Sequence, residues 1–162
     1  MDAPPLTPLA AALLAVPAPE RALLIGSGDG EPALLLAREF PSARVRGVDR
    51  SPERIREALA KVGLDPEGRI AFKRARPASL PYPDDFFDLV AQVDDRVSPR
   101  EAARVLCAGG HFVHATATAS RLAPRMRRRL LVGGLTRQGF EVDLAQRAGS
   151  GNFLVARLDR SR

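Results

Sequence analysis

Cysteine is nearly absent from this 162-residue chain, because Cys107 is the only one. A single cysteine excludes an internal disulfide framework and any zinc site built from several thiolates. Long apolar runs are also missing: the longest, Leu9 to Val16, is far shorter than the roughly 20 residues that span a bilayer. No basic leader precedes this run, since the first basic residue is Arg21. These features predict a reduced, cytoplasmic protein that does not engage a membrane.

Aromatic residues and lysines are scarce as well. The chain has seven phenylalanines, one tyrosine and no tryptophan, so it lacks the interleaved aromatic side chains on which nucleic-acid bases stack. Only two of its 25 basic residues are lysines, and its net charge is +6. Residues 102–140 contain no acidic residue but seven arginines. A solvated helix face is the plainer explanation of this run, and an acidic or phosphate-bearing partner is the alternative.

Short apolar runs alternate with helical patterns along the chain. The apolar runs predict strands at residues 21–25, 44–48, 69–74, 87–93 and 111–118. Prolines and capping residues at the starts of amphipathic patterns predict helices at residues 7–16, 32–40, 51–62, 98–107 and from 124 onward. Residues 77–85 read as a loop. Two more strands, 141–146 and 153–158, flank the glycine-rich turn at 149–152, which favours a hairpin.

This element order predicts the fold class. Strands that alternate with helices require parallel crossovers, and helices cover both faces of such a sheet. We therefore predict an α/β fold with a doubly wound, Rossmann-like sheet of about seven strands. The sheet is mostly parallel and ends in a C-terminal antiparallel hairpin. Residues 1–20 are expected to form an N-terminal helix and linker, and residues 21–162 a single domain.

Two helices carry finer predictions. Ser98 and Glu101 have the spacing of a capping box, so this helix should begin at Pro99 and run to Cys107, with Gly109-Gly110 terminating it. In the helix that begins near Pro124, apolar residues must cover the sheet, and those expected to point inward are Leu130, Leu131 and Leu135. The arginines then left in water on one face are Arg125, Arg128 and Arg129.

A glycine-rich turn, Gly26-Ser27-Gly28-Asp29-Gly30, follows the first predicted strand and precedes a helix. Glycine permits backbone to approach a ligand closely, and the helix N-terminus presents free N–H groups to an anion. Asp49 stands nineteen residues after Gly30, at the end of the second strand. A carboxylate there can accept hydrogen bonds from both hydroxyls of a ribose. The turn and Asp49 together predict a nucleoside-bearing cofactor.

The glycine pattern distinguishes between cofactors. A dinucleotide fingerprint needs glycine where Glu31 stands, and the Gly-Lys-Ser/Thr of a phosphate loop is absent. The pattern G-x-G-x-G resembles the first motif of class I S-adenosylmethionine-dependent methyltransferases, in the small-molecule, type 11-like branch. Five further segments resemble that family's later motifs in order: residues 47–52, 80–84, 87–90, 104–110 and 139–140. The resemblance covers residues 21–158, nearly the whole chain.

The resemblance implies that S-adenosylmethionine is the cofactor and that nine residues bind it. The backbone of the glycine turn would approach the methionyl and adenosine parts, and Asp49 would bind the ribose. Arg50 and the start of the loop at residues 77–85 would border the adenine, and Gln92 would lie beneath the ligand. The implied cofactor-binding residues are Gly26, Ser27, Gly28, Gly30, Asp49, Arg50, Pro77, Ala78 and Gln92. Leu24 and Arg76 stand where the family usually has acids. No catalytic residue is assigned, and two histidines do not make a metal site.

The acceptor predicted by this branch is a small molecule. Base-modifying relatives carry an Asn/Asp-Pro-Pro-aromatic motif after the fourth strand, and residues 92–95 lack it. Asp94 and Asp95, at the ligand-binding edge, could act as bases or be solvated turn residues. The alternative function is a catalytically reduced binding module that engages a partner or nucleic acid through the arginine-rich helix. The oligomeric state is not predicted.

Overall fold

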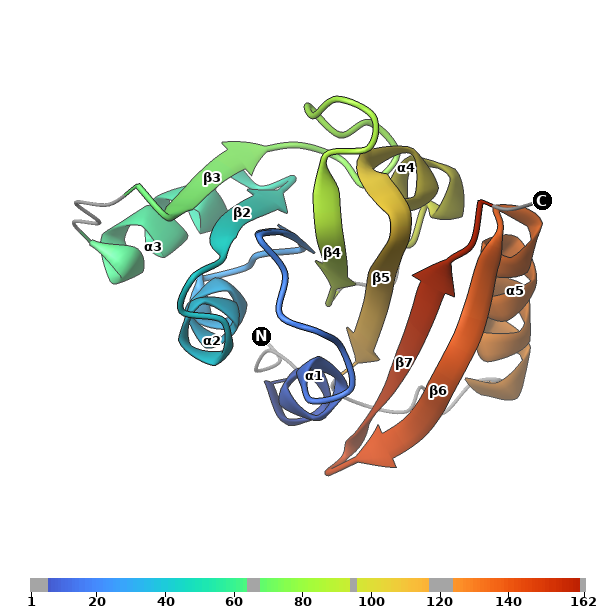
Figure 1. Ribbon diagram of the computed structural model, residues 1–162. Coiled ribbons are helices and arrows are strands. Elements are labelled where there is room, and N and C mark those ends of the chain that lie inside the picture. Colours follow the sequence, from blue (N-terminus) through green and yellow to red (C-terminus); the bar gives the residue numbers. More distant parts are fainter. Residues whose placement is uncertain (1–5, 64–67, 94–95, 117–123, 161–162) are drawn as a thin grey trace.

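The computed structural model describes residues 6–63, 68–93, 96–116 and 124–160 (Figure 1). Seven strands form one sheet in the order β3-β2-β1-β4-β5-β7-β6. The strands are β1 (Arg21–Ile25), β2 (Arg44–Asp49), β3 (Ile70–Arg74), β4 (Phe87–Gln92), β5 (Leu106–Thr116), β6 (Phe140–Ala148) and β7 (Gly151–Leu158). The helices are α1 (Leu6–Leu13), α2 (Glu31–Glu39), α3 (Pro52–Val62), α4 (Pro99–Val105) and α5 (Pro124–Arg137).

Strand direction confirms the predicted fold class. β1 pairs in parallel with β2 and β4, β2 with β3, and β4 with β5. β7 is antiparallel to both β5 and β6, and β6 and β7 form the predicted C-terminal hairpin. The chain moves outward from β1 through β2 to β3 and then returns to β4 on the other side of β1. Ligands bind at such a reversal, beyond the carboxyl ends of the strands.

Helices cover both faces of the sheet (Figure 1). Side chains of each central strand alternate between the two faces. Leu24 and Leu89 face one side, where they pack with buried residues of α1 and α2. Leu23 and Val90 face the other side, with residues of α4 and α5. α3 packs beside α2 over β2 and β3. Burial of two apolar layers around a central sheet is the main force that holds the domain together.

The connection between β3 and β4 is a loop, as predicted. Tyr82 and Phe86 of this loop pack against the α4 side of the core. Their rings meet the ring of Phe87 nearly edge-on, with centroids 4.9 and 5.0 Å apart. Aromatic pairs in this arrangement are favourable beyond the area they bury. The ring cluster therefore anchors the loop whose first residues, Pro77 and Ala78, belong to the predicted cofactor site.

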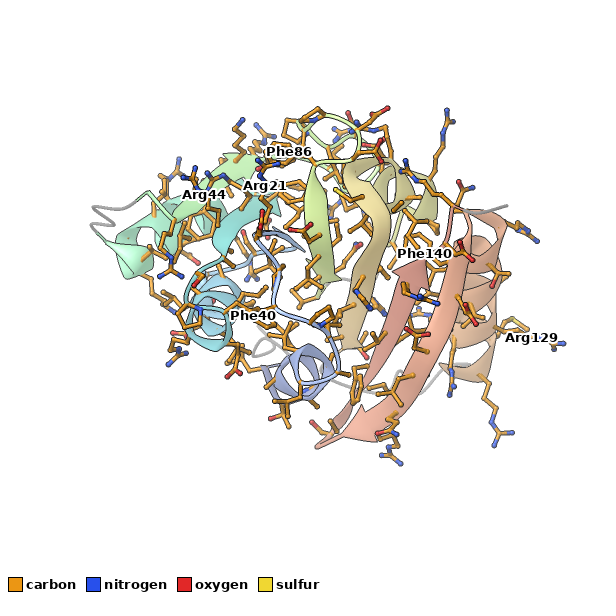
Figure 2. All side chains as sticks on the ribbon, in the orientation of Figure 1. Arg21, Phe40, Arg44, Phe86, Arg129 and Phe140 are labelled. Carbon is orange, nitrogen blue, oxygen red and sulfur yellow. The ribbon has the colours of Figure 1, made fainter. Side chains whose placement is uncertain are left out.

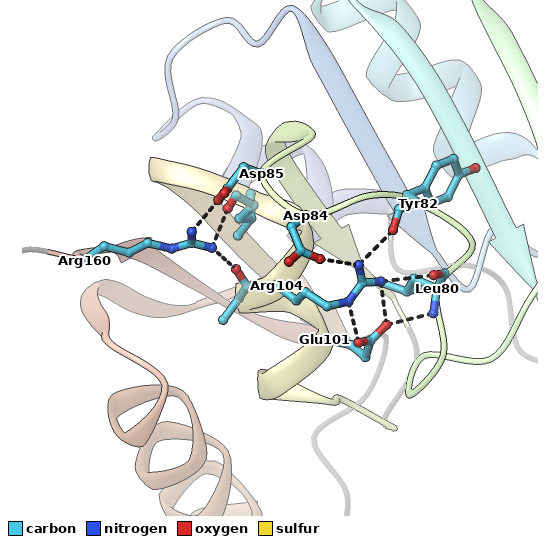
Figure 3. A network of polar contacts seen from close by, with 9 residues as sticks. Leu80, Tyr82, Asp84, Asp85, Glu101, Arg104 and Arg160 are labelled. Atoms are coloured by element: carbon cyan, nitrogen blue, oxygen red, sulfur yellow. Dashed lines mark hydrogen bonds and ion pairs between the residues drawn. The ribbon is translucent and has the colours of Figure 1, made fainter.

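Arg104 at the end of α4 holds the same loop through polar contacts (Figure 3). Its guanidinium donates to the carbonyl oxygens of Tyr82 (2.8 Å) and Leu80 (3.1 Å). It also pairs with Asp84 at 2.8 Å and with Glu101 at 2.7 Å. Glu101 in turn accepts the backbone N–H of Leu80 at 2.8 Å. One arginine thus ties three points of the loop to α4.

The capping box predicted for α4 is wrong. The Ser98 side chain makes no capping hydrogen bond, although the helix does begin at Pro99. The Glu101 carboxylate is occupied by Arg104 and by the Leu80 N–H, so it does not turn back to the helix start. The end of the helix also differs from the prediction. α4 stops at Val105 and β5 begins at once, because Leu106 pairs with Phe87 ahead of a bulge in the β4–β5 ladder.

Helix α5 is less buried than predicted. Leu135 is fully buried and Leu131 half-buried, but Leu130 is 71% exposed, so the prediction that it points inward is wrong. α5 covers the sheet mainly with its C-terminal half. The arginines expected in water are exposed, namely Arg125, Arg128 and Arg129, and Figure 2 shows Arg129 projecting away from the body of the protein.

The first helix also differs from its prediction at both ends. α1 includes Leu6, so Thr7 lies within the helix rather than capping it, and the helix ends at Leu13 instead of Val16. Leu9 and Leu13 are buried against the sheet. Within the described ranges, no helix is both long and apolar enough to cross a membrane. The predicted last two residues of the fifth strand, 117 and 118, lie outside the described residues.

Candidate functional site

The glycine-rich turn lies between β1 and α2, at the carboxyl edge of the sheet. The carbonyl oxygen of Val48 accepts the N–H groups of Gly26 (2.9 Å) and Ser27 (3.0 Å). The Gly30 N–H closes the turn on the Ser27 carbonyl at 3.0 Å. These hydrogen bonds join the turn to the end of β2, so two strands that are distant in sequence shape one edge.

Gly28 and Gly30 are required for different reasons. Both have a positive backbone φ, +54° and +95°, which residues other than glycine rarely adopt. A Cβ on Gly30 would lie 3.0 Å from Cα of Ala58 on α3, so Gly30 serves the packing of α2 against α3. A Cβ on Gly28 would lie 3.3 Å from the Arg54 guanidinium, a flexible group at the surface of the turn. Gly28 is therefore required for its positive φ, since the nearest neighbour of an added Cβ is a movable side chain.

Asp49, at the end of β2, links the turn to the start of α3. Its Oδ2 accepts the Gly28 N–H at 3.0 Å, and its Oδ1 accepts the Ser51 N–H at 2.9 Å. An ionised carboxylate offers about four acceptor positions. About two positions therefore remain after these backbone contacts, enough for the two hydroxyls of a ribose. The same contacts fix the carboxylate in place before a ligand arrives.

Two polar side chains are fully buried beneath this edge, Ser27 and Gln92. The Ser27 hydroxyl has no hydrogen-bond partner among the described residues. A buried polar atom without a partner is costly, and such atoms in folded proteins commonly meet a ligand or an ordered water. The Gln92 amide donates to the carbonyl oxygen of Arg96 at 3.0 Å and so fixes the chain after β4.

A hollow of about 720 Å³ opens beside Asp49. Its lining comes from the carboxyl ends of three parallel strands, β2, β3 and β4, and from the loop after β3. The lining residues are Arg50, Arg74, Ala75, Arg76, Ser79 and Arg96. Pro77 is buried and Ala78 exposed in the short turn between Arg76 and Ser79. Pockets for cofactors and small ligands are typically about 300–1,000 Å³, so the hollow has a suitable size.

A lysine of α3 forms ion pairs with the two acids at the end of the glycine turn. Lys61 pairs with Asp29 at 2.6 Å and with Glu31 at 3.3 Å. Partial burial acts to raise the pKa of Asp29, but hydrogen bonds from Lys61 and from the Glu31 N–H, together with Arg54, lower it on balance. Asp49 makes no ion pair within the described ranges. Of the three acids described here, Asp29, Glu31 and Asp49, Asp49 is therefore the one whose carboxylate is not paired with a lysine.

The structure brings most of the predicted residues to one edge. Gly26, Ser27 and Gly28 are hydrogen-bonded to β2, where Asp49 ends the strand, and Arg50 lines the adjoining hollow. Leu24, which stands where the family usually has an acid, is fully buried among apolar residues on the α1 and α2 side of the sheet. Arg76, which stands at the second usually acidic position, is exposed and lines the hollow. The binding roles of these residues stay predictions.

Sequence reasoning missed Arg74 and Arg96, although a signal was present. Arg74 ends a predicted strand and Arg96 follows another by three residues, and parallel strands bring these ends to one edge. Cys107, by contrast, has a structural role: its thiol donates to the Asp85 carbonyl at 3.0 Å, and burial raises its pKa. Asp94 and Asp95 lie outside the described residues. Among the side chains that are described, no cluster of three or more His, Cys, Asp or Glu could hold a metal ion.

Comparison with known proteins identifies the family. Residues 23–114, more than half of the chain, match a family model described as a methyltransferase domain. The chain is 36% identical over 115 residues to the 27-O-demethylrifamycin SV methyltransferase of Amycolatopsis mediterranei, covering 66% of this chain and 42% of that protein. It is 34% identical over 104 residues to the demethylmenaquinone methyltransferase of Thermus thermophilus, covering 59% and 46%. The chain thus matches less than half the length of both relatives.

A solved structure extends the likeness in fold over almost the entire chain. It is one chain of a complex described as being between the Haloferax volcanii Trm112 methyltransferase activator and a methyltransferase. The TM-score is 0.83, with 98% of this chain and 91% of that chain covered, and the identity is 17%. At that identity the likeness shows the fold alone. The matched family model, the sequence relatives and the glycine turn with Asp49 agree: the chain belongs to the class I S-adenosylmethionine-dependent methyltransferases, whose cofactor is S-adenosylmethionine.

Proposed function

We propose that this protein transfers a methyl group from S-adenosylmethionine to a small-molecule acceptor. The observation that carries the proposal is the Asp49 carboxylate, fixed by the Gly28 and Ser51 N–H groups with acceptor positions to spare. The relatives support the small-molecule class, since their names refer to a rifamycin and a menaquinone precursor. The identity of the acceptor of this chain is not assigned.

The residues at the edge suit the cofactor. Asp49 would accept the ribose hydroxyls, and the backbone of Gly26, Ser27 and Gly28 would face the methionyl and adenosine parts. The orphaned Ser27 hydroxyl supports a ligand at the turn, because a bound polar group would give it the partner it lacks. The residues proposed to border the adenine and the underside of the ligand are Arg50, Pro77, Ala78 and Gln92. Gly30 would contribute by holding α2 against α3.

Bound S-adenosylmethionine supplies a methyl group already activated by its sulfonium. The protein therefore needs mainly to hold the two reactants in line and to exclude water. Asp49 would fix the ribose, and the buried Gln92 would keep the chain after β4 in place through its bond to Arg96. No side chain is assigned as a general base, and none is needed for an acceptor that is already nucleophilic.

The test is calorimetric titration with S-adenosylhomocysteine, the demethylated product, using the wild type, Asp49→Ala and a control. Removing a charged hydrogen-bond acceptor costs about 1.5–3 kcal/mol, so Asp49→Ala should weaken binding at least about tenfold. Asp143→Ala is the matched control, because Asp143 is an exposed carboxylate on β6, away from the glycine turn. Circular dichroism must show that both variants fold. Equal affinity of wild type and Asp49→Ala would remove Asp49 from the site.

A further inference from the structure

We propose that the exposed N-terminal half of α5 binds the surface of a membrane that contains anionic phospholipids. The observation behind this inference is a pair of apolar side chains set among arginines. Met126 is 64% exposed and Leu130 is 71% exposed, and both belong to α5. Every side chain from Arg125 to Leu130 is exposed, so this half of the helix contributes little to the core. The inference goes beyond the proposed function and does not depend on it.

The apolar pair faces away from the protein. Met126 and Leu130 are four positions apart, so they share one face of the helix. At about 3.6 residues per turn, Leu135 lies on the side of the helix opposite Met126. Leu135 is fully buried in the core beneath α5, so Met126 and Leu130 face outward. Neighbouring apolar side chains on an exposed face can mark a contact surface, whereas single ones are ordinary.

Arginines flank the apolar pair. By the same helix geometry Arg125 and Arg129 lie to one side of it, and Figure 2 shows Arg129 projecting away from the body of the protein. Neither arginine forms an ion pair with an acid among the described residues. α5 contains five arginines, and residues 102–140 contain no acid. Asp94 and Asp95 lie outside the described residues, and two carboxylates would not neutralise five arginines.

The acids of the neighbouring strand β6 lie on the other face of the sheet. Glu141 is the cross-strand partner of Arg157, and the two residues that flank Arg157 in β7 belong to the core on the α5 side. Because side chains alternate along a strand, Arg157 and Glu141 project from the opposite face, where they pair at 3.5 Å. Asp143 acts to raise the pKa of His111, the β5 partner of Arg157, so it belongs to that face as well. The outward face of α5 therefore keeps its positive charge.

An anionic lipid surface suits both kinds of side chain on this face. The apolar side chains of a helix that lies on a membrane enter the acyl boundary, while its arginines remain at the phosphates. Nucleic acid offers phosphates but no apolar layer, and α5 has no aromatic side chain on which a base could stack. A second copy of this face would be repelled by like charge, and an acidic protein would need a pocket for each apolar side chain. A lipid surface needs no such fit.

A helix that lies on a membrane surface needs only an apolar face, whereas the lack of long apolar runs bears on helices that span the membrane. The proposal therefore replaces the sequence-based expectation that the protein does not engage a membrane. α5 follows β5 and precedes β6, and both strands are antiparallel to β7. The first turns of α5 thus lie toward the carboxyl edge of the sheet, the edge at which Asp49 ends β2.

The experiment measures co-sedimentation of the full chain with vesicles near physiological ionic strength. One set of vesicles is phosphatidylcholine alone, and the other is a mixture of phosphatidylcholine with phosphatidylglycerol. The charge variant is Arg125→Gln/Arg129→Gln. Its matched control is Arg38→Gln/Arg44→Gln, which removes the same charge from exposed positions of α2 and β2. Circular dichroism verifies that each variant folds.

The contribution of the apolar pair is tested separately. The apolar variant is Met126→Gln/Leu130→Gln. Its matched control is Leu14→Gln/Leu59→Gln, which replaces the other two large apolar side chains that are exposed in the described part of the chain. A single-stranded oligonucleotide and polyglutamate serve as probes for the two other classes of partner.

We expect the wild type to bind the mixed vesicles at least about tenfold more tightly than phosphatidylcholine alone. Each basic residue near an anionic leaflet contributes about fivefold, so the charge variant should bind at least about tenfold more weakly and its control within about threefold of wild type. The apolar variant should bind at least about threefold more weakly and its control within about twofold.

Equal binding of the wild type to both kinds of vesicle would overturn the proposal. Equal losses in either variant and its control would do the same, as would an apolar variant that binds like the wild type. Tighter binding of the oligonucleotide or of polyglutamate than of the mixed vesicles would also overturn it and assign the face to nucleic acid or to an acidic protein. None of these outcomes bears on the binding of S-adenosylhomocysteine, which tests the proposed function.

Discussion

Replacing Arg104 by alanine should destabilise the fold by removing the link between α4 and the loop after β3. The guanidinium makes two bonds to Glu101, one to Asp84 and two to backbone carbonyls of the loop (Figure 3). The Glu101 side chain is only 16% exposed, so it would be left with a charge that lacks its partner. The Asp84 side chain is 72% exposed, and its bond to Arg104 should contribute little.

The size of the effect follows from these exposures. Breaking a buried ion pair costs about 3–5 kcal/mol, and hydrogen bonds to charged groups contribute about 1.5–3 kcal/mol each without adding up. Because Arg104 is 30% exposed, solvent screens part of this interaction. We expect a loss of about 2–4 kcal/mol from a total stability of about 5–15 kcal/mol. Urea unfolding followed by circular dichroism measures it, with Arg129→Ala as the exposed control, expected within about 0.5 kcal/mol of wild type.

The same pair predicts a pH dependence. The hydrogen bond from Arg104 lowers the pKa of Glu101 below its ordinary value of 4.5, against a smaller opposing effect of burial. A carboxylate whose pKa is lowered by folding stabilises the native state above its unfolded pKa and loses that contribution as the pH falls through the folded pKa. The stability gap between wild type and Glu101→Gln should therefore be full at pH 7 and narrow below about pH 4. An Arg104→Ala protein as stable as the control, or a gap that widens in acid, would refute this reasoning.

Three further outcomes are expected. Gly30→Ala should lower stability, because the new Cβ would lie 3.0 Å from the Ala58 Cα at a positive φ; an unchanged melting temperature would contradict this packing. Leu135→Ala should cost about 2–5 kcal/mol in urea unfolding, whereas Leu130→Ala should cost under about 1 kcal/mol, since their exposures are 0% and 71%; equal costs would reverse our description of α5. Oligonucleotide binding through Arg125, Arg128 and Arg129 should be nonspecific and disappear near physiological ionic strength, and tight sequence-selective binding in a salt series would contradict the solvated-face interpretation of α5.

Local sequence patterns predicted the features of the fold that depend on periodicity and turn chemistry. The apolar run at residues 21–25 predicted β1 with the bounds that the structure shows, and Gly149-Ser150 indicated the turn of the C-terminal hairpin. The spacing of the glycine turn and Asp49 predicted two segments that the structure joins by a hydrogen bond from Gly28. These features are encoded by residues near one another in sequence or by a regular strand–helix alternation.

Features decided by tertiary contacts were not predictable in this way. Glu101 has the spacing of a capping residue, but Arg104 and the Leu80 N–H compete for its carboxylate. Leu130 has the apolar character of a core residue, but α5 meets the sheet farther along, at Leu135. The arginine-lined hollow is formed by residues at or after the ends of three strands, so no single segment of the sequence indicates that it exists.

The most direct test of the account is a crystal structure of the protein with S-adenosylhomocysteine bound. We predict that both ribose hydroxyls donate to the Asp49 carboxylate, with the methionyl part over the backbone of Gly26 to Gly28 and the Ser27 hydroxyl no longer without a partner. A ligand bound elsewhere on the protein, or one whose ribose makes no contact with Asp49, would contradict the central claim.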